Sequence, residues 1–258
     1  MSSVPAGRAA IENLEVSAAL SWRAPDEERL GDWLLRAADG FTGRANSALA
    51  TGDPGVPLAG AVERVRAWYA ARGLRPMIAV PFPMAGPAGS AADRYLADQG
   101  WSLRDAPAVV MTAEVRALAP LAGSGAAVSL DDAPDDAWLA MYHYRGTELP
   151  PIARRLLTSA PWQAFGSVRQ AGQTIAIGRV AAADGWAGLT AIETDPRHRR
   201  RGLATAVTAA LAAAAAPRGV TRLFLQVENG NAAARALYGG LGFTAHHRYH
   251  YRLAPPGE

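Results

Sequence analysis

The passage from an apolar strand to an alanine-rich helix constrains this chain more than any other feature. Trp186 to Thr194 is predicted to be a strand, and Pro196 ends it because proline cannot donate to a sheet ladder. Arginines crowd residues 197–201, and Gly202 opens a predicted helix from Leu203 to Ala216. The first N–H groups of a helix have no partner inside it, and the helix dipole adds positive potential there. The passage therefore predicts a cradle for a phosphate or pyrophosphate.

Two other interpretations of this loop start from the same residues. The simpler one is a basic loop that only leads into a helix. The other is nucleic-acid binding, which an arginine run favours, although no aromatic side chains alternate with these arginines. The chain contains neither the GxxxxGK[ST] sequence of a nucleoside triphosphate site nor the GxGxxG sequence of a dinucleotide site, which argues against both ligands.

Composition narrows the class of protein. Of the 258 residues, 50% are hydrophobic and 19% are charged, which excludes a disordered chain. The absence of cysteine excludes a disulfide scaffold, a zinc–thiolate site and a cysteine nucleophile. All 26 basic residues are arginine, the formal net charge is +3, and the positive excess lies in the C-terminal half. That excess favours an anionic ligand.

The apolar runs bear on the location of the protein. Residues 1–10 contain no apolar core of a secretory signal. The most apolar run, Gly202 to Pro217, is shorter than the ~20 residues that a membrane-spanning helix needs. We therefore expect a cytoplasmic protein that makes no membrane contact.

Hydrophobic periodicity predicts strands and helices in mixed order. The predicted strands are Trp33–Ala38, Phe41–Leu49, Pro76–Val80, Ala108–Val115, Val128–Leu130, Trp162–Arg169, Thr174–Ala182, Trp186–Thr194, Arg222–Val227 and His246–Leu253. The predicted helices are Leu58–Ala71, Ala91–Gln99, Asp131–Met141, Leu203–Ala216 and Asn231–Gly240. A hairpin turn is expected at Asp39-Gly40, and residues 1–30 are weakly patterned. This order predicts an α+β fold with helices on a mixed central sheet.

An uncharged Ala/Gly/Pro-rich stretch, Ala117–Gly125, is the candidate linker between two domains, residues 1–120 and 121–258. The two parts share a faint pattern. Arg-Gly followed by an apolar strand occurs at residue 72 and again at residue 218, and the helix after each strand ends near a Gly-aromatic pair, Gly100-Trp101 and Gly242-Phe243. The pattern indicates two versions of one unit in tandem.

A second motif completes the case for a family. Asn231, Ala234, Tyr238, Gly242 and Phe243 follow the pattern Asn-x-x-Ala-x-x-x-Tyr-x-x-x-Gly-Phe. In the earlier loop, Arg199, Gly202 and Ala204 follow the pattern Gln/Arg-x-x-Gly-x-Gly/Ala. Together and in this order, separated by a helix and a strand, the two motifs resemble the GNAT superfamily of acyl-CoA-dependent N-acyltransferases. The resemblance covers about residues 126–253.

The resemblance implies a GNAT fold and an N-acetyltransferase that transfers an acetyl group from acetyl-CoA to a primary amine. The amine attacks the thioester directly, so the missing cysteine is no obstacle. The implied acetyl-CoA contacts are Ile192, Glu193 and Thr194 for the pantetheine arm, Arg199, Arg200, Arg201, Gly202, Leu203, Ala204 and Thr205 for the pyrophosphate, and Asn231 for the cysteamine end. Tyr238 would also contact acetyl-CoA and would protonate the leaving thiolate as general acid, because a phenol is protonated at neutral pH.

The general base is less clearly marked. Gly188 and Gln226 stand at the two positions where members of the family carry a carboxylate. Glu193 is the best remaining candidate, and the alternatives are a role as an exposed strand residue, a water chain, or proton transfer through His246, His247 and His250. Alternation along a strand splits these histidines between faces, so we expect no metal site.

Other features leave the substrate open. Tyr142, His143, Tyr144, Arg145 and Glu148 lie where the family builds its acceptor pocket, but the same residues suit an ordinary solvated helix with aromatics in the core. The N-terminal part is predicted to be a degenerate copy, since Leu96 stands where the C-terminal part has Tyr238. A non-catalytic acyl-CoA sensor is the alternative function. The sequence leaves a homodimer open and makes a nucleic-acid partner the weaker interpretation.

Overall fold

The computed structural model describes residues 6–85, 90–105, 107–143 and 148–256. The chain divides into two compact units. Unit 1 comprises Met1–Val110, Val227–Gly230 and Ala245–Glu258, and unit 2 comprises Met111–Gln226 and Asn231–Thr244. This division differs from a single boundary between residues 120 and 121, because the last strand of the chain pairs inside unit 1.

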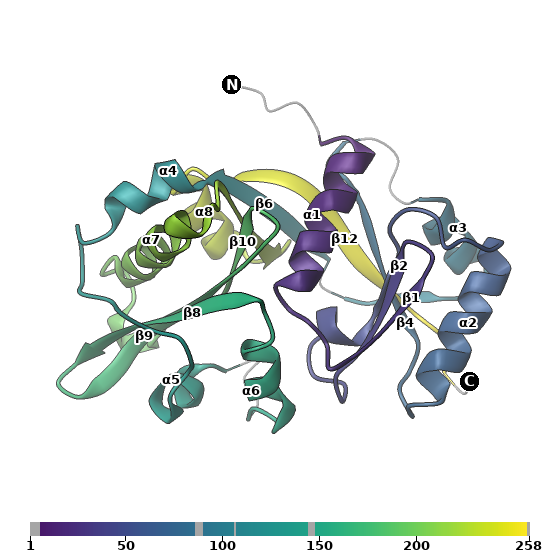
Figure 1. The fold of residues 1–258 in the computed structure, drawn as a ribbon, viewed down its shortest axis with the longest axis horizontal. Helices are drawn as coiled ribbons and strands as arrows, with labels where there is room; N and C mark the ends of the chain where they lie inside the picture. The colour runs from purple at the N-terminus through teal and green to yellow at the C-terminus, as the bar shows by residue number, and fades with distance from the viewer. Residues whose placement is uncertain (1–5, 86–89, 106, 144–147, 257–258) are drawn as a thin grey trace. The chain divides into compact units, whose positions relative to one another are not determined.

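Unit 1 is built on a sheet in the order β1-β2-β3-β4-β12 (Figure 1). Its strands are β1 (Asp26–Leu30), β2 (Trp33–Ala37), β3 (Ala48–Leu49), β4 (Met77–Pro83) and β12 (Thr244–Leu253), with β5 (Ser102–Leu103) added along β12. Pairs β1–β2, β2–β3 and β4–β12 are antiparallel, and β3–β4 is parallel. Its helices are α1 (Arg8–Leu20), α2 (Leu58–Ala70) and α3 (Ala91–Asp98).

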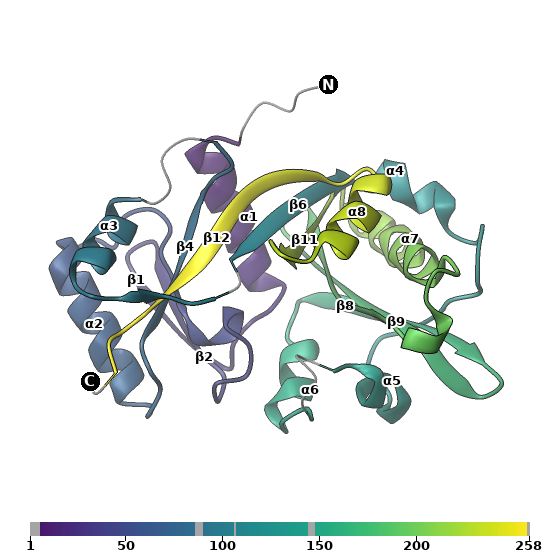
Figure 2. The ribbon, with the colours of Figure 1, turned by 180° about the vertical axis from the view of Figure 1, so that it is seen from behind.

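Helices cover both faces of the unit 1 sheet (Figures 1 and 2). Apolar side chains of α2 and α3, including Val62, Val65 and Leu96, are buried in one core with Trp33 and Leu35 of β2. The spacing of the buried α2 residues follows one face of a helix, as the periodicity predicted. Helix α1 packs against β4 on the opposite face, so every strand face near the middle of the sheet is covered.

The strands of unit 2 pair antiparallel, apart from one parallel pair at the end. Their order is β11-β10-β9-β8-β7, with β7 (Ser129–Asp131), β8 (Trp162–Gln170), β9 (Gln173–Ala183), β10 (Trp186–Thr194) and β11 (Arg222–Glu228). Strand β6 (Ala108–Glu114) and the last two residues of β11 lie where the division between the units falls. Helix α7 (Leu203–Ala215) covers one face, and α5 (Asp136–Met141) and α6 (Ile152–Leu157) lie on the other (Figure 1). Helix α8 (Ala232–Gly240) precedes β12.

Glycines let α7 approach the unit 2 sheet closely. A Cβ atom at Gly178 would lie 2.6 Å from Val207 of α7 and 2.6 Å from Ile192 of β10, and one at Gly166 would lie 3.4 Å from Leu211. On the opposite face, the Trp138 ring of α5 meets Phe165 of β8 edge-on at 5.2 Å. The sheet is thus sandwiched between helices, which is the layer arrangement that the sequence predicted.

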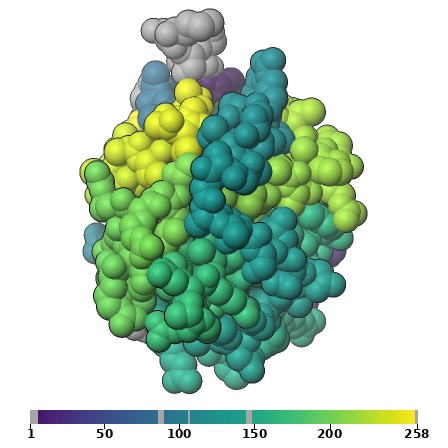
Figure 3. All heavy atoms as spheres, turned by 90° about the vertical axis from the view of Figure 1, so that its left-hand side faces the viewer, coloured from purple at the N-terminus to yellow at the C-terminus, as the bar shows by residue number. Residues whose placement is uncertain are grey.

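Several local elements differ from those predicted. Residues 1–30 contain α1 and β1 rather than an unpatterned segment, and β2 forms a hairpin with β1 while it pairs with residues 41–49 only at Leu34–Leu49. The candidate linker Ala117–Gly125 contains helical turns, the end of α4 (Val115–Leu118) and η2 (Ala119–Leu121), which pack on α7. Figure 3 shows the segment from α4 to β7 as a teal band on the surface of unit 2. The predicted helix Asp131–Met141 begins only at Asp136, because Asp135 caps it through the Trp138 N–H.

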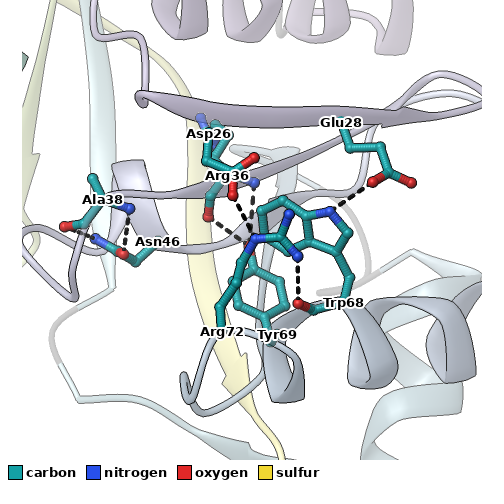
Figure 4. A network of polar contacts seen from close by, with 8 residues as sticks. All are labelled: Asp26, Glu28, Arg36, Ala38, Asn46, Trp68, Tyr69 and Arg72. Carbon is teal, nitrogen blue, oxygen red and sulfur yellow. Dashed lines mark hydrogen bonds and ion pairs between the residues drawn. The ribbon is translucent and has the colours of Figure 1, made fainter.

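The stretch from Phe41 to Ser47 is not a strand because Asn46 uses its side chain to hold a loop. Its Oδ1 accepts a hydrogen bond from the Ala38 N–H at 2.8 Å (Figure 4). The same oxygen accepts from the Gly40 N–H at 2.9 Å, and the Nδ2 donates to the Phe41 carbonyl at 2.7 Å. Arg44–Asn46 forms the short helix η1. A buried amide that satisfies several backbone groups fixes a loop without sheet pairing.

Beside this loop, the Tyr69 hydroxyl of α2 donates to the Arg36 carbonyl of β2 at 2.8 Å (Figure 4). The Trp68 indole donates to Glu28 at 2.7 Å, and the Arg72 guanidinium lies over the Trp68 ring while pairing with Asp26 at 2.6 Å. These contacts fasten the C-terminal half of α2 to β1 and β2.

The two units share an order of elements. In each, two antiparallel pairs are followed by one parallel pair: β1–β2, β2–β3 and β3–β4 in unit 1, and β8–β9, β9–β10 and β10–β11 in unit 2. A helix connects the two parallel strands in each case, α2 or α7, and another helix follows, α3 or α8. Among the described residues, no helix is long and apolar enough to cross a membrane.

Candidate functional site

The start of α7 forms an uncapped helix N-terminus. Gly202 precedes the helix with φ 74°, and no side chain caps it. The first hydrogen bond inside the helix runs from the Ala206 N–H to the Gly202 carbonyl at 3.0 Å, so the N–H groups of the three residues between them have no partner within the helix. Gly202 lies in the left-handed region that glycine adopts without strain. A Cβ there would meet nothing within 4 Å, which leaves the approach to these N–H groups open.

The arginines before Gly202 divide into two kinds. Arg197 is held by Asp195, whose carboxylate accepts from the guanidinium at 2.8 and 3.2 Å and from the Arg197 N–H at 2.8 Å. Asp195 is also the N-cap of η4 (Pro196–His198), and the hydrogen bonds from Arg197 keep its pKa well below the ordinary value. Arg199, Arg200 and Arg201 are exposed and form no ion pair within the described part of the chain. These three arginines directly precede the free end of α7 in the chain and add positive charge to the positive end of the helix dipole.

The parallel strands next to this loop separate. β10 and β11 are paired from Trp186–Arg222 to Leu189–Leu225, and within the described residues of unit 2 no pair follows. β10 then bulges between Thr190 and Glu193, where Ala191 has φ 53°. A bulge bends a strand and turns its side chains. The edge of β10 that faces away from β9 therefore carries unpaired backbone groups at Ile192 to Thr194, where the sequence predicted contacts to a pantetheine arm.

After the bulge, neighbouring side chains of β10 lie on opposite faces of the sheet, and the extra residue shifts this alternation relative to the first half of the strand. Ile192 lies on the α7 face, against Gly178. Glu193 lies on the other face, where its carboxylate accepts from the His143 N–H at 3.2 and 3.3 Å. The His143 Nδ1 is 3.8 Å from Glu193 Oε2. Burial raises the pKa of the Glu193 carboxyl, while the His143 N–H and ring act in the opposite direction. Glu193 is therefore a half-buried carboxylate with a definite orientation, and the alternative of an exposed strand residue does not describe it.

The two family carboxylate positions are filled differently here. A Cβ at Gly188 would lie 2.5 Å from the tip of the Phe224 ring, so this position has no room for a longer side chain. Gln226 is the last residue of β11 in unit 2. The packing of Phe224 against Gly188 explains why position 188 of β10 cannot hold a carboxylate.

Tyr238 lies in α8 with its ring buried, and the Phe243 ring contacts it edge-on at 5.7 Å. Burial raises the pKa of Tyr238 to about 12. Its hydroxyl makes no hydrogen bond to any described residue, and no described side chain competes for its proton. A phenol in this state is a proton donor at neutral pH.

Asn231 has a structural task that the sequence analysis did not anticipate. Its Oδ1 accepts from the Ala234 N–H at 3.0 Å, so Asn231 is the N-cap of α8. The Nδ2 donors of its side chain remain for a ligand. The predicted helix Asn231–Gly240 accordingly begins one residue later.

His247 and His250 lie on opposite faces of β12, one toward α1 and the other toward α3, as alternation along the strand predicted. His247 is fully buried and its Nε2 lies 2.7 Å from Glu15 of α1, with the His246 ring nitrogen 2.8 Å from its other nitrogen. His250 faces α3, where Asp93 accepts from it at 2.7 Å. Groups of three or more potential metal ligands are absent from the described part of the chain.

A cavity of about 550 Å³ lies where the acceptor pocket was expected. It is lined by the end of α5 and the start of α6, and includes Tyr142, His143, Glu148 and Arg154. Tyr144 and Arg145, which were also predicted to contact a substrate, fall outside the described residues. Trp138 to Leu157 is not one helical region, because α5 ends at Met141 and α6 begins at Ile152. The contact between His143 and Glu193 had no signal in the sequence, since Ala191 does not announce a left-handed bulge.

Comparisons with known proteins show the family of the chain. The family model described as "Probable histone acetyltransferase Rv0428c C-terminal" matches residues 8–252. The probable histone acetyltransferase Rv0428c of Mycobacterium tuberculosis is 32% identical over 268 residues, which cover 97% of this chain and 76% of that protein.

Solved structures show the fold. A GCN5-related N-acetyltransferase from Kribbella flavida matches with a TM-score of 0.70 at 19% identity, covering 96% of both chains. A tandem GNAT protein from the clavulanic acid biosynthesis pathway matches with a TM-score of 0.60 at 16% identity, covering 96% of this chain and 89% of the other. The predicted α+β GNAT fold is thereby confirmed. The chain belongs to the family of the Rv0428c C-terminal region and is a GNAT-type N-acetyltransferase.

Proposed function

We propose that unit 2 transfers an acetyl group from acetyl-CoA to a primary amine, with Tyr238 as general acid. The observation that carries the proposal is the uncapped start of α7 beside three unpaired arginines, next to a parallel strand pair that separates. This arrangement suits a long ligand with a charged pyrophosphate at one end and an amide-containing arm at the other. When bound, acetyl-CoA supplies the thioester that the amine attacks.

The residues present fit such a ligand. Arg199 to Thr205 would hold the pyrophosphate through guanidinium groups and free helix N–H groups. Backbone groups of Ile192 to Thr194 would pair with the pantetheine amides as an added strand does. The Nδ2 of Asn231 would donate to the cysteamine end, since its Oδ1 is used in the helix cap.

Glu193 would accept the proton that an ammonium substrate must lose before attack. A general base works best when its pKa lies near the working pH, and burial moves Glu193 in that direction. The His143 N–H fixes the orientation of the carboxylate. The cavity beside His143 would hold the acceptor amine.

Tyr238 would donate its proton to the departing sulfur. Its raised pKa keeps the phenol protonated, and its free hydroxyl can point to the ligand without breaking another bond. No side chain has to form a covalent intermediate.

The identity of the amine is the next question. The Mycobacterium tuberculosis relative is named a probable histone acetyltransferase. A lysine-containing peptide is therefore the first substrate to test, followed by small amines. The competing function is a non-catalytic acyl-CoA sensor, which the missing carboxylates at residues 188 and 226 favour.

We further propose that residues 1–120 and 121–258 derive from two GNAT-like copies, of which the first is degenerate. The repeated strand directions and helix positions of the two units support this origin. The compact units differ from that boundary because the final strand, β12, pairs with β4 of unit 1.

The test is a calorimetric titration of the whole chain with acetyl-CoA. The Arg199→Ala/Arg201→Ala variant is expected to bind about 10- to 100-fold more weakly, because each charged hydrogen bond contributes about 1.5–3 kcal/mol before solvent screening. Arg64→Ala, an exposed arginine of α2, is the matched control and should bind as the wild type does. Equal affinity in all three proteins would contradict the pyrophosphate site.

A further inference from the structure

Unit 1 contains a cavity of about 440 Å³ that the acetyl transfer does not use. It lies at the carboxyl ends of the parallel strands β3 and β4, at the starts of α2 and α3, and beneath α1. Among its lining residues are Ile11, Trp33, Val56, Leu58, Phe82 and Ala92. A volume in the range of roughly 300–1,000 Å³ with mostly apolar walls is typical of small-molecule sites.

The strand pair above this cavity opens for a physical reason. β3 and β4 are paired at Ala48–Ile78 and Leu49–Ala79, and the Ala50 N–H still donates to the Ala79 carbonyl at 3.0 Å. The next residues of β4 include Pro81 and Pro83, which line the cavity and have no N–H to continue the pairing. The strands therefore separate, and the carboxyl ends of parallel strands are where open sheets bind ligands.

The charged groups at the cavity cancel each other. Two charged side chains line it, Arg8 and Glu12 of α1, and they pair at 2.7 Å. Glu12 also accepts from the Gly52 N–H at 3.1 Å, and Arg8 donates to the Gly52 carbonyl at 3.4 Å. The connection from residue 50 to residue 57 contains no arginine. An anionic ligand would therefore find no free cation among the lining side chains, unlike at residues 199–201 of unit 2.

The walls favour a flat apolar molecule. The Trp33 and Phe82 rings form part of the lining, together with Pro54, Pro81 and Pro83. Trp33 and Phe82 are buried, with exposed fractions of 2% and 7% that include any surface facing the cavity, so the core fixes both side chains. Aromatic and proline faces pack well against planar rings, and fixed walls lose little entropy when a ligand binds.

We propose that this cavity is a second binding site, in unit 1, for a small uncharged aromatic molecule. The site is independent of the pyrophosphate loop of unit 2 and of the acetyl transfer. Its recognition rests on packing against the mostly apolar lining and on the absence of net charge among the side chains that line it.

The probe for the test is 5-fluoroindole, titrated into the whole protein and followed by fluorine NMR. We expect saturable one-to-one binding below about 1 mM. Ala92→Phe, which places a ring in the cavity from α3, should weaken binding by at least about tenfold. Ala97→Phe is the matched control, because Ala97 is exposed on the same helix and does not line the cavity. Val56→Phe fills the cavity from the α2 side and replaces Ala92→Phe if that variant does not fold.

Two results would overturn the proposal. One is the absence of saturable binding to the wild-type protein, or equal binding by the cavity-filled and control variants. The other is a calorimetric titration in which Ala92→Phe loses one of two acetyl-CoA sites, since the cavity would then bind an anionic cofactor. An unchanged acetyl-CoA stoichiometry together with lost 5-fluoroindole binding supports the proposal.

Discussion

The starts of α2 and α7 occupy the same place in two similar arrangements, yet they present different chemistry. Both helices follow the first strand of a parallel pair, and neither has a side-chain cap. In unit 2 the helix is preceded by three unpaired arginines and a left-handed glycine, whereas in unit 1 it is preceded by Pro57 and a connection without arginine. The fold supplies an opening between strands in both units, and the connecting residues decide what kind of ligand can enter it.

The helices that follow differ in the same way. α8 carries the buried Tyr238 with a free hydroxyl, and α3 carries Leu96 in the core. Each helix begins with a capping side chain, Asn231 or Ser90, so the local fold is preserved while the proton donor is not.

The largest expected effect is on the rate of acetyl transfer, which should depend on α8 and not on α3. Tyr238→Phe should lower the rate of acetyl transfer about 100- to 10,000-fold, because the leaving thiolate loses its acid, while acetyl-CoA affinity stays unchanged. Leu96→Met in α3 is the matched control and should leave the rate unaltered. The measurement is thiol release with a lysine peptide or an amine panel. Turnover by Tyr238→Phe at the wild-type rate would remove Tyr238 from the mechanism.

A smaller effect concerns the base. Glu193→Gln should reduce the rate about 100-fold at neutral pH. In the wild type, the rate should fall as the pH is lowered through a pKa above the ordinary glutamate value, because burial favours the protonated carboxyl. The pH profile of kcat/KM should lose this acid limb in the glutamine variant. A variant that keeps the limb would point to a water chain instead.

The smallest expected effect is on the stability of unit 1 at acid pH. Burial alone would raise the pKa of Asp93, but hydrogen bonds from His250 and Arg252 lower it well below its ordinary value. A carboxyl whose pKa is depressed by folding contributes stability above its unfolded pKa near 4, and this contribution is lost as the pH falls through the folded pKa. Unit 1 should therefore lose stability below about pH 4.

Asp93→Asn should destabilise unit 1 by about 1.5–3 kcal/mol at pH 7 and remove the acid-dependent part. Urea unfolding at pH 7 and pH 3, followed by amide exchange of α3 and β12, measures both quantities. Asp98→Asn, at the exposed end of α3, is the control. An identical pH dependence in Asp93→Asn and wild type would show that this cluster does not link stability to pH.

Much of the fold could be predicted because the relevant signals are local. The period of apolar residues located α2, α7 and the strands β8, β9 and β10 to within a few residues. The failures have identifiable causes: Asn46 bonds to backbone groups that a strand would have used, and the uncharged stretch after β6 forms helical turns because α7 buries it. Neither partner is visible from the residues alone.

The sequence by itself determined the family and the two motifs, since Arg199, Gly202, Asn231 and Tyr238 are read from type and spacing. Only the tertiary structure decided which way Glu193 faces, because a bulge at Ala191 changes the alternation that a strand pattern assumes. It also decided that the last strand belongs to unit 1, through its pairing with β4. Local chemistry is written in neighbouring residues, whereas orientation and pairing depend on contacts between residues far apart in the chain.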